Sequence, residues 1–218
     1  MVGDVADGAK GVLAFFAVAI VITAIMVYLF SGSVMLTLLP IACSLIAVIW
    51  QMGMLTVLGF GIDPMSILVP FLVFAIGVSH GVQMINATGK NVALGMDAKT
   101  AAQASFRKLL IPGGIALLSD TVGFITLLII EIGVIRELAI TASLGVGIII
   151  LTNLILLPVL MSYVKFSDKY KQKVQTPHPR IEKFWYNLSA FATPKYAVVI
   201  LIATAALFAL GWQQSAYL

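Results

Sequence analysis

The sequence predicts an all-α integral membrane protein, a six-helix transmembrane bundle with a cytoplasmic amphipathic linker helix. Hydrophobic residues make up 61% of the 218 residues, and the mean hydropathy is +1.09. Only 10% of the residues are charged, whereas a soluble domain carries roughly 25%. The apolar residues also gather into runs of about 20 residues, which is the helical length that crosses a hydrocarbon core.

The six runs span residues 11–30, 33–57, 65–86, 108–130, 137–162 and 195–213. Helices are expected because lipid offers no water to unpaired backbone groups. Strands of a lipid-facing barrel would alternate apolar and polar residues, and these runs do not. Pro40, Pro70, Pro112 and Pro158 fall inside or near the runs. In a bundle, neighbouring helices can satisfy the carbonyl that each proline frees.

The composition also excludes several classes of protein. There is too little polar side chain for a cytosolic enzyme, a nucleic-acid-binding domain or a disordered tail. The isoelectric point of 9.2 and the net charge of +4 come from cations at the ends of apolar runs, which is a membrane signature. The lone cysteine, Cys43, excludes an internal disulfide. Asp4 and Asp7 precede the first run, which therefore does not resemble a signal peptide with its basic start.

The cations lie almost entirely on one side of the six spans. With alternating loops, eleven lysines and arginines fall on one side, and only Lys10 and Arg136 fall on the other. The positive-inside rule places the cation-rich side in the cytoplasm, so both ends of the chain are expected at the outer face. Asn86 and Asn187 match a glycosylation pattern but fall on the inner side, and we discount them.

We expect four segments: an outer juxtamembrane segment at 1–10, a five-helix bundle at 11–163, a basic linker at 164–194 and a sixth span at 195–218. The linker places Ile181, Phe184, Trp185 and Leu188 at positions i, i+3, i+4 and i+7. This spacing predicts an amphipathic helix that lies on the inner leaflet. A helix that binds a protein partner is the alternative.

Two titratable residues interrupt the apolar runs. A charge at the bilayer centre costs about 2.5–3.5 kcal/mol for aspartate on insertion scales, so it persists where something uses or neutralises it. Asp120 is twelve residues beyond Lys108, which places it roughly 18 Å along the fourth run. His80 is six residues before Asn86, about 9 Å from the inner end of the third run.

Polar and small residues lie near both His80 and Asp120 in the sequence. Ser79, Gln83 and Asn86 follow a helical repeat beside His80, and such a stripe is expected to face the bundle interior or a wet cavity. Gly77 and Gly81 form a small-xxx-small pair that favours close helix packing. The same packing role is expected of Ala116 and Gly123, which flank Asp120, and Thr121 lies next to this carboxylate. Asn153 in the fifth run is expected to hydrogen-bond across helices.

Three interpretations of the His80–Asp120 pair stay open. Histidine changes charge near neutral pH, and desolvation moves a carboxyl pKa toward the same range, so the pair could relay protons. An interhelical hydrogen bond without proton movement is the second interpretation. Metal ligation is the third, and it is weak with one histidine and one aspartate. No phosphate-binding loop or hydrolase motif occurs. We therefore expect no cofactor, no bound metal and no enzyme, and an ion gradient as any energy source.

Several stretches resemble a known superfamily of membrane transporters. They are residues 63–70 (DPMSILVP) with 74–80 (FAIGVSH), 107–124 ending in SDTVGF, 135–138 (IREL) and 153–158 (NLILLP). They resemble the resistance-nodulation-cell division (RND) superfamily, and within it the bacterial exporters related to mycobacterial membrane protein large and to hopanoid transporters. The resemblance covers nearly the whole chain.

The resemblance implies a larger machine than these 218 residues. Family members have twelve spans, two large periplasmic domains and an internal duplication. This chain looks like spans two to seven, with a sterol-sensing-domain-like five-helix bundle followed by the start of the second half. In the family, protons drive transport across the bacterial inner membrane through titratable residues in the fourth and tenth spans. Ser79 and His80 fall where many relatives carry Asp and Tyr or paired Asp, and Asp120 would supply the missing carboxylate.

The expected function is therefore proton-driven export of hydrophobic or lipid-like molecules. His80 and Asp120 would carry the proton, and Ser79, Gln83 and Thr121 would support them. The expected partners are the substrate, protons, membrane lipids and the rest of the transporter, with a possible dimer or trimer and no nucleic acid. The alternatives are a lipid-sensing or lipid-binding module without transport, and an intramembrane enzyme, for which few further polar groups are available.

Overall fold

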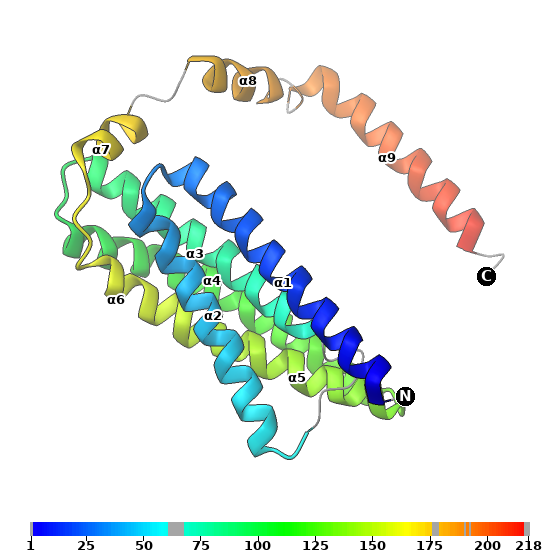
Figure 1. Ribbon diagram of the computed structural model, residues 1–218. Coiled ribbons are helices and arrows are strands. Elements are labelled where there is room, and N and C mark those ends of the chain that lie inside the picture. The colour runs from blue at the N-terminus through cyan, green and yellow to red at the C-terminus, as the bar shows by residue number, and fades with distance from the viewer. Residues whose placement is uncertain (1, 61–67, 176–178, 190, 192, 216–218) are drawn as a thin grey trace. The chain divides into compact units, whose positions relative to one another are not determined.

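The computed structural model describes residues 2–60, 68–175, 179–189, 191 and 193–215, and every regular element in these ranges is helical. The helices are α1 (Val2–Ser31), α2 (Val34–Val57), α3 (Val69–Ala93), α4 (Ala98–Thr126), α5 (Gly133–Ile149), α6 (Leu157–Met161), α7 (Asp168–Gln175), α8 (Pro179–Ser189) and α9 (Pro194–Ser215). A short 3-10 helix, Leu127–Ile129, ends α4, and a π-helix, Ile150–Leu156, joins α5 to α6. Figure 1 shows α5 and α6 as one continuous rod.

Six helical segments in the described residues are long and apolar enough to cross a membrane, which confirms the predicted fold class. They are Gly11–Ser31, Val34–Val57, Val69–Ala93, Ala98–Ile129, Gly133–Met161 and Tyr196–Gln214. The expected inner ends of the third and fourth spans are wrong. The region assigned to a loop at 87–107 is a helical hairpin that turns at Gly95, where φ is 97°. Asp97 caps α4 by accepting a hydrogen bond from the Thr100 amide at 3.1 Å.

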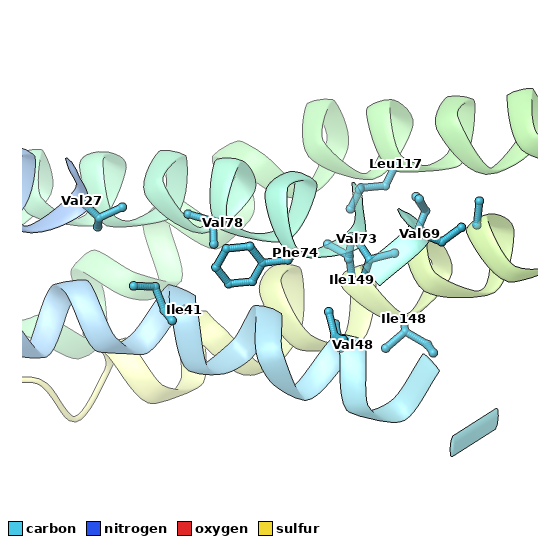
Figure 2. Close-up of a cluster of buried hydrophobic side chains, with 13 residues drawn as sticks. Val27, Ile41, Val48, Val69, Val73, Phe74, Val78, Leu117, Ile148 and Ile149 are labelled. Carbon is cyan, nitrogen blue, oxygen red and sulfur yellow. The ribbon is translucent and has the colours of Figure 1, made fainter. Parts of the chain in front are cut away.

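The chain forms two compact units, residues 1–174 and 175–218. In the first unit, α2, α3 and α5 carry most of the buried residues, whereas α1 and α4 expose most of their length. Figure 2 shows the main apolar cluster, in which Ile41 and Val48 of α2 face Val73, Phe74 and other residues of α3. The remaining members are Ala47 of α2 and residues of α1, α4 and α5: Val27, Leu117, Ala142, Val146, Ile148 and Ile149.

Proline shapes two of the central helices. Pro158 has no amide proton to donate to the carbonyl four residues earlier, and the π-helix Ile150–Leu156 widens the backbone immediately before it. Pro40 lies inside α2, where the Ser44 hydroxyl donates a 2.7 Å hydrogen bond to the Pro40 carbonyl. The π-helix and the turn at Pro40 lie within membrane-spanning segments, and the buried side chains of Asn153 and Ser44 come from them.

A second apolar cluster closes the end of the first unit where α7 lies. Tyr170 of α7 is buried there with Met84 and Ile85 of α3. The remaining members of the buried cluster are Leu36, Leu39, Cys43, Ala102, Leu157, Met161 and Val164. Part of the segment expected as a linker at 164–194 therefore packs on the bundle. The second unit contains α8 and α9.

Candidate functional site

The π-helix places Asn153 at the centre of a polar contact between helices. This side chain is 1% exposed, and its Nδ2 donates a 3.2 Å hydrogen bond to the Thr152 hydroxyl. The hydroxyl of Ser44 on α2 lies 3.5 Å from Asn153 Oδ1, which is the cross-helix hydrogen bond expected for Asn153. Such a bond contributes about 0.6 kcal/mol in a membrane protein, so its main effect is to fix the register of the two helices.

Two glycines of α3 face this contact. A Cβ on Gly77 would lie 2.7 Å from the Ser44 hydroxyl and 3.0 Å from Asn153 Nδ2. A Cβ on Gly81 would lie 2.5 Å from the Cβ of Pro40 and 3.3 Å from Asn153 Oδ1. Only glycine fits at these positions without a shift of its neighbours. The two glycines therefore let α3 approach α2 and the π-helix closely.

Gln51 makes a second buried polar contact on α2, beyond that of Ser44 with Asn153. It lies seven residues, or about two turns, beyond Ser44 on the same face of the helix. Gln51 is fully buried, and its Nε2 donates a 3.0 Å hydrogen bond to the main-chain carbonyl of Thr141 on α5. Its Oε1 has no partner among the described residues. A Cβ on Gly145 would lie 2.9 Å from the Gln51 amide, so the amide rests on the bare α5 backbone.

His80 lies at the boundary between α3 and α4 and is partly buried. Its Nδ1 is 3.0 Å from the carbonyl of Ile76. Because a carbonyl only accepts hydrogen bonds, Nδ1 carries a proton and Nε2 keeps its lone pair in the neutral ring. A Cβ on Gly113 of α4 would lie 3.8 Å from the His80 ring. The imidazole therefore faces α4 with one nitrogen fixed and the other available to a proton.

The polar stripe beside His80 lies on the outside of the first unit. Ser79, Gln83 and Asn86 are all exposed, whereas we expected the stripe to face the interior or a wet cavity. The interior side of α3 belongs to residues on the opposite face, including Gly77, Gly81 and Val73. The small residues occupy the interior face of α3 because they allow its close contact with α2. The polar residues of the stripe therefore lie on the exposed face.

Asp120 is also exposed at the surface of the first unit. Its neighbour Thr121 donates a 2.8 Å hydrogen bond to the Leu117 carbonyl, and the Ser143 hydroxyl of α5 lies 3.5 Å from the Thr121 carbonyl. Thr121 thus faces α5. A Cβ on Gly123 would meet nothing within 4 Å, so this glycine makes no close helix contact within the first unit.

The structure does not bring His80 and Asp120 into direct contact. Gly113, which faces His80, is seven residues before Asp120, so both lie on nearly the same side of α4 about 10 Å apart. No hydrogen bond or ion pair joins His80 to Asp120 within the described ranges. A proton moving between them would need water.

At the opposite end from the α4–α5 turn, α7 holds two spans together. Lys173 Nζ donates hydrogen bonds to the carbonyls of Leu29 and Phe30 at 3.2 and 3.1 Å. These carbonyls end α1, where the helix dipole is negative and a cation is stabilising. The Tyr170 hydroxyl packs directly on Gly89 of α3. Burial raises the pKa of Tyr170 above its ordinary value.

The described residues contain no group of three or more His, Cys, Asp and Glu side chains that could hold a metal ion. The sequence reasoning missed Gln51 and Ser44, although a glutamine inside an apolar run is itself a signal of buried hydrogen bonding. It also missed Lys173 and Tyr170, because nothing in a basic linker shows which of its residues dock on the bundle.

The family of this chain follows from a comparison with known proteins. Residues 29–176 match the family model described as the sterol-sensing domain of SREBP cleavage-activation. The matched region runs from the end of α1 through α7. It therefore contains the buried polar residues Ser44, Gln51 and Asn153, as well as His80 and Asp120. No curated protein matches the chain. The match covers more than half of the sequence, and the chain therefore belongs to the sterol-sensing domain family, a family of multi-pass membrane modules related to sterols and lipids.

Proposed function

We propose that this chain is part of a proton-driven RND-type exporter of hydrophobic or lipid-like molecules in a bacterial inner membrane. The observation that carries the proposal is that His80 of α3 faces Gly113 of α4, because Asp120 lies seven residues further along nearly the same side of α4. A carboxylate within a membrane-spanning segment is by default a functional group, because a charge held in the bilayer is costly.

His80 can accept a proton without losing its orientation. Its Nδ1–H stays bonded to the Ile76 carbonyl in both charge states, and the incoming proton binds Nε2. Asp120, about 10 Å along α4 from the Gly113 that faces His80, exchanges protons with His80 through a short chain of water molecules. Ser79 and Gln83 adjoin His80 on α3, and Thr121 adjoins Asp120 on α4, where they hydrogen-bond that water.

The outward position of these polar groups supports a partner on this face. Asp120, Ser79 and Gln83 are exposed on spans that have lipid as their default neighbour. Lipid would leave their hydrogen bonds unmade. The other half of an exporter, packed against α3 and α4, would cover these polar groups and enclose the water between His80 and Asp120. Gly123, which is open in the first unit, would then provide the close contact.

The test is transport by the full-length protein in proteoliposomes with an imposed pH gradient. Export of a fluorescent phospholipid analogue and proton flux, followed with a pH-sensitive dye, are measured together. We expect Asp120→Asn and His80→Gln to remove both signals, while Ser119→Ala, an exposed neighbour on α4, keeps them. Full proton-coupled transport by Asp120→Asn would refute the relay.

The second candidate is a lipid-sensing or lipid-binding module without transport, and the match to a sterol-sensing family supports it no more than it supports transport. A sensor binds lipid with no proton flux coupled to the ligand. The same reconstituted protein distinguishes the two functions. Saturable lipid binding that is unchanged by Asp120→Asn and moves no protons would select the sensor.

A further inference from the structure

Helix α8 carries an apolar stripe that the described residues of the second unit leave exposed. Phe184, Trp185 and Leu188 are 57%, 60% and 45% exposed, and their spacing along the helix puts them within about 100° of one another. The rings of Phe184 and Trp185 meet edge to face with centroids 5.5 Å apart. Lys183 and Tyr186 lie on the remaining circumference and are exposed. The helix is therefore apolar on one side and polar on the other.

We propose that α8 binds the anionic lipid surface of the cytoplasmic leaflet as an interfacial helix. Phe184, Trp185 and Leu188 insert into the boundary between headgroups and acyl chains, and Lys183 contacts lipid phosphates. An amphipathic helix of this kind gains from apolar burial and from attraction to anionic lipid. The proposal is independent of proton-driven transport.

The length of the chain between α8 and α9 supports a membrane partner. Ser189 ends α8 and Pro194 begins α9, whose Tyr196–Gln214 segment can span a membrane. The five Cα-to-Cα steps from Ser189 to Pro194 reach at most about 18 Å when fully extended, so α8 stays close to the bilayer surface. Phe191 and Tyr196 pack with centroids 5.8 Å apart at this junction, and aromatic residues favour the membrane interface.

The charge of the surrounding segment is complementary to an anionic leaflet. Residues 164–194 contain six lysines and arginines and two acidic residues, a net charge of +4 that equals the net charge of the whole chain. The cations are Lys165, Lys169, Lys171, Lys173, Arg180 and Lys183. Anionic lipids at the cytoplasmic surface attract such segments within a Debye length. Because the short connection to the α9 span keeps α8 near the bilayer, we infer that α8 binds an anionic lipid surface rather than a soluble acidic protein.

The test compares the two faces of α8 in the full chain. In a Cys43→Ser background, Leu188→Cys and Tyr186→Cys are labelled with a membrane-impermeant maleimide in vesicles of phosphatidylcholine mixed with phosphatidylglycerol. We expect Leu188→Cys to react about tenfold more slowly than Tyr186→Cys, because its face is inserted. Equal rates overturn the proposal, as does equal protection of Leu188→Cys in pure phosphatidylcholine. Equal rates that diverge only when another protein is added would assign the stripe to a protein partner instead.

Lys183 provides the charge arm of the experiment. Adding Lys183→Gln to Leu188→Cys removes one cation near the anionic surface and should speed labelling about fivefold. Lys99→Gln, an exposed lysine on α4, is the matched control and should leave the rate unchanged. As an independent readout, Trp185 is kept as the sole tryptophan with Trp50→Phe and Trp212→Phe. Its fluorescence should be quenched by shallow brominated phosphatidylglycerol, and unquenched emission contradicts insertion.

Discussion

Gln51 on α2 donates a 3.0 Å hydrogen bond to the main-chain carbonyl of Thr141 on α5 and keeps its Oε1 buried without a partner. The side-chain amide of Gln51 therefore makes a hydrogen bond through Nε2 and, among the described residues, none through Oε1. A cross-helix hydrogen bond contributes about 0.6 kcal/mol in a membrane protein, whereas a buried unpaired carbonyl costs about 1–3 kcal/mol. In the described structure Gln51 therefore costs more stability than it contributes.

Replacing Gln51 with leucine should stabilise the bundle. Gln51→Leu removes the unpaired Oε1 at similar volume, and we expect the free energy of unfolding to rise by about 1 kcal/mol. Denaturation in bicelles, followed by circular dichroism, measures the change. Gln83→Leu, at an exposed position of α3, is the control and should change stability by less than about 0.5 kcal/mol. A clear loss of stability in Gln51→Leu would mean that Oε1 accepts a hydrogen bond from water or a ligand.

The contact of α5 with Gln51 depends on Gly145. An added Cβ would collide with Val73 and lie 2.9 Å from the Gln51 amide. Gly145→Ala should therefore lower the free energy of unfolding by about 1–3 kcal/mol, the usual cost of overpacking. Gly147→Ala is the matched control two residues away, where a Cβ meets nothing within 4 Å. Equal stability of the two variants would show that α2 and α5 are loosely packed here.

The sequence predicts the number and type of the spans because each needs about 20 apolar residues and hydropathy records this directly. The hairpin of α3 and α4 was predicted too short because its inner turns leave the apolar runs. Lys90, Lys99 and Arg107 lie on these helices. A helix that continues into water loses its hydropathy signal but keeps its backbone hydrogen bonds, and the Asp97 cap marks where α4 begins.

The candidate site was only partly predictable. The sequence identifies the residues of the stripe at Ser79, Gln83 and Asn86, but a helical repeat does not show which way a face points. In a membrane, both the interior and the lipid-facing surface are apolar, so hydropathy does not separate them. The direction is decided by packing, here by Gly77 and Gly81 against Pro40, Ser44 and Asn153. These contacts join residues far apart in sequence.

The contact of Tyr170 with Gly89 predicts a titration that reports the docking of α7. Burial raises the pKa of Tyr170, so the docked state is fully stable below the ordinary tyrosine pKa of about 10 and is lost as pH rises through the raised value. Gly89→Ala places a Cβ against the Tyr170 hydroxyl. We expect it to undock α7 and return the pKa of Tyr170 to its ordinary range.

Absorbance titration of tyrosinate measures this change, and the difference from Tyr170→Phe assigns the signal. Gly133→Ala, where a Cβ meets nothing within 4 Å, should leave the titration unchanged. An unshifted Tyr170 pKa in Gly89→Ala would mean that α7 stays buried through its other contacts, such as the pairing of Phe166 with Tyr170 at a centroid distance of 5.6 Å.

The cap of α4 gives a prediction of opposite pH dependence. The pKa of Asp97 is lowered by hydrogen bonding to the Thr100 side chain and, next, to the Thr100 amide, which donates to Asp97 Oδ2 at 3.1 Å. The contribution of this cap to helix stability is therefore complete above the ordinary aspartate pKa of about 3.9 and is lost as pH falls through the lowered value. Amide hydrogen exchange at Thr100 and Ala101 measures the fraying of the first turn.

Two variants separate the charge of Asp97 from its cap. Asp97→Asn keeps an oxygen acceptor for the Thr100 amide, so we expect protection of the first turn that no longer depends on acid. Asp97→Ala removes the acceptor and should expose this turn at every pH. If Asp97→Ala protects Thr100 as well as the native residue does, the hairpin is held by the hydrogen bond of Asn91 to Ser105 at 2.9 Å instead. Removing that bond with Ser105→Ala would then fray the turn.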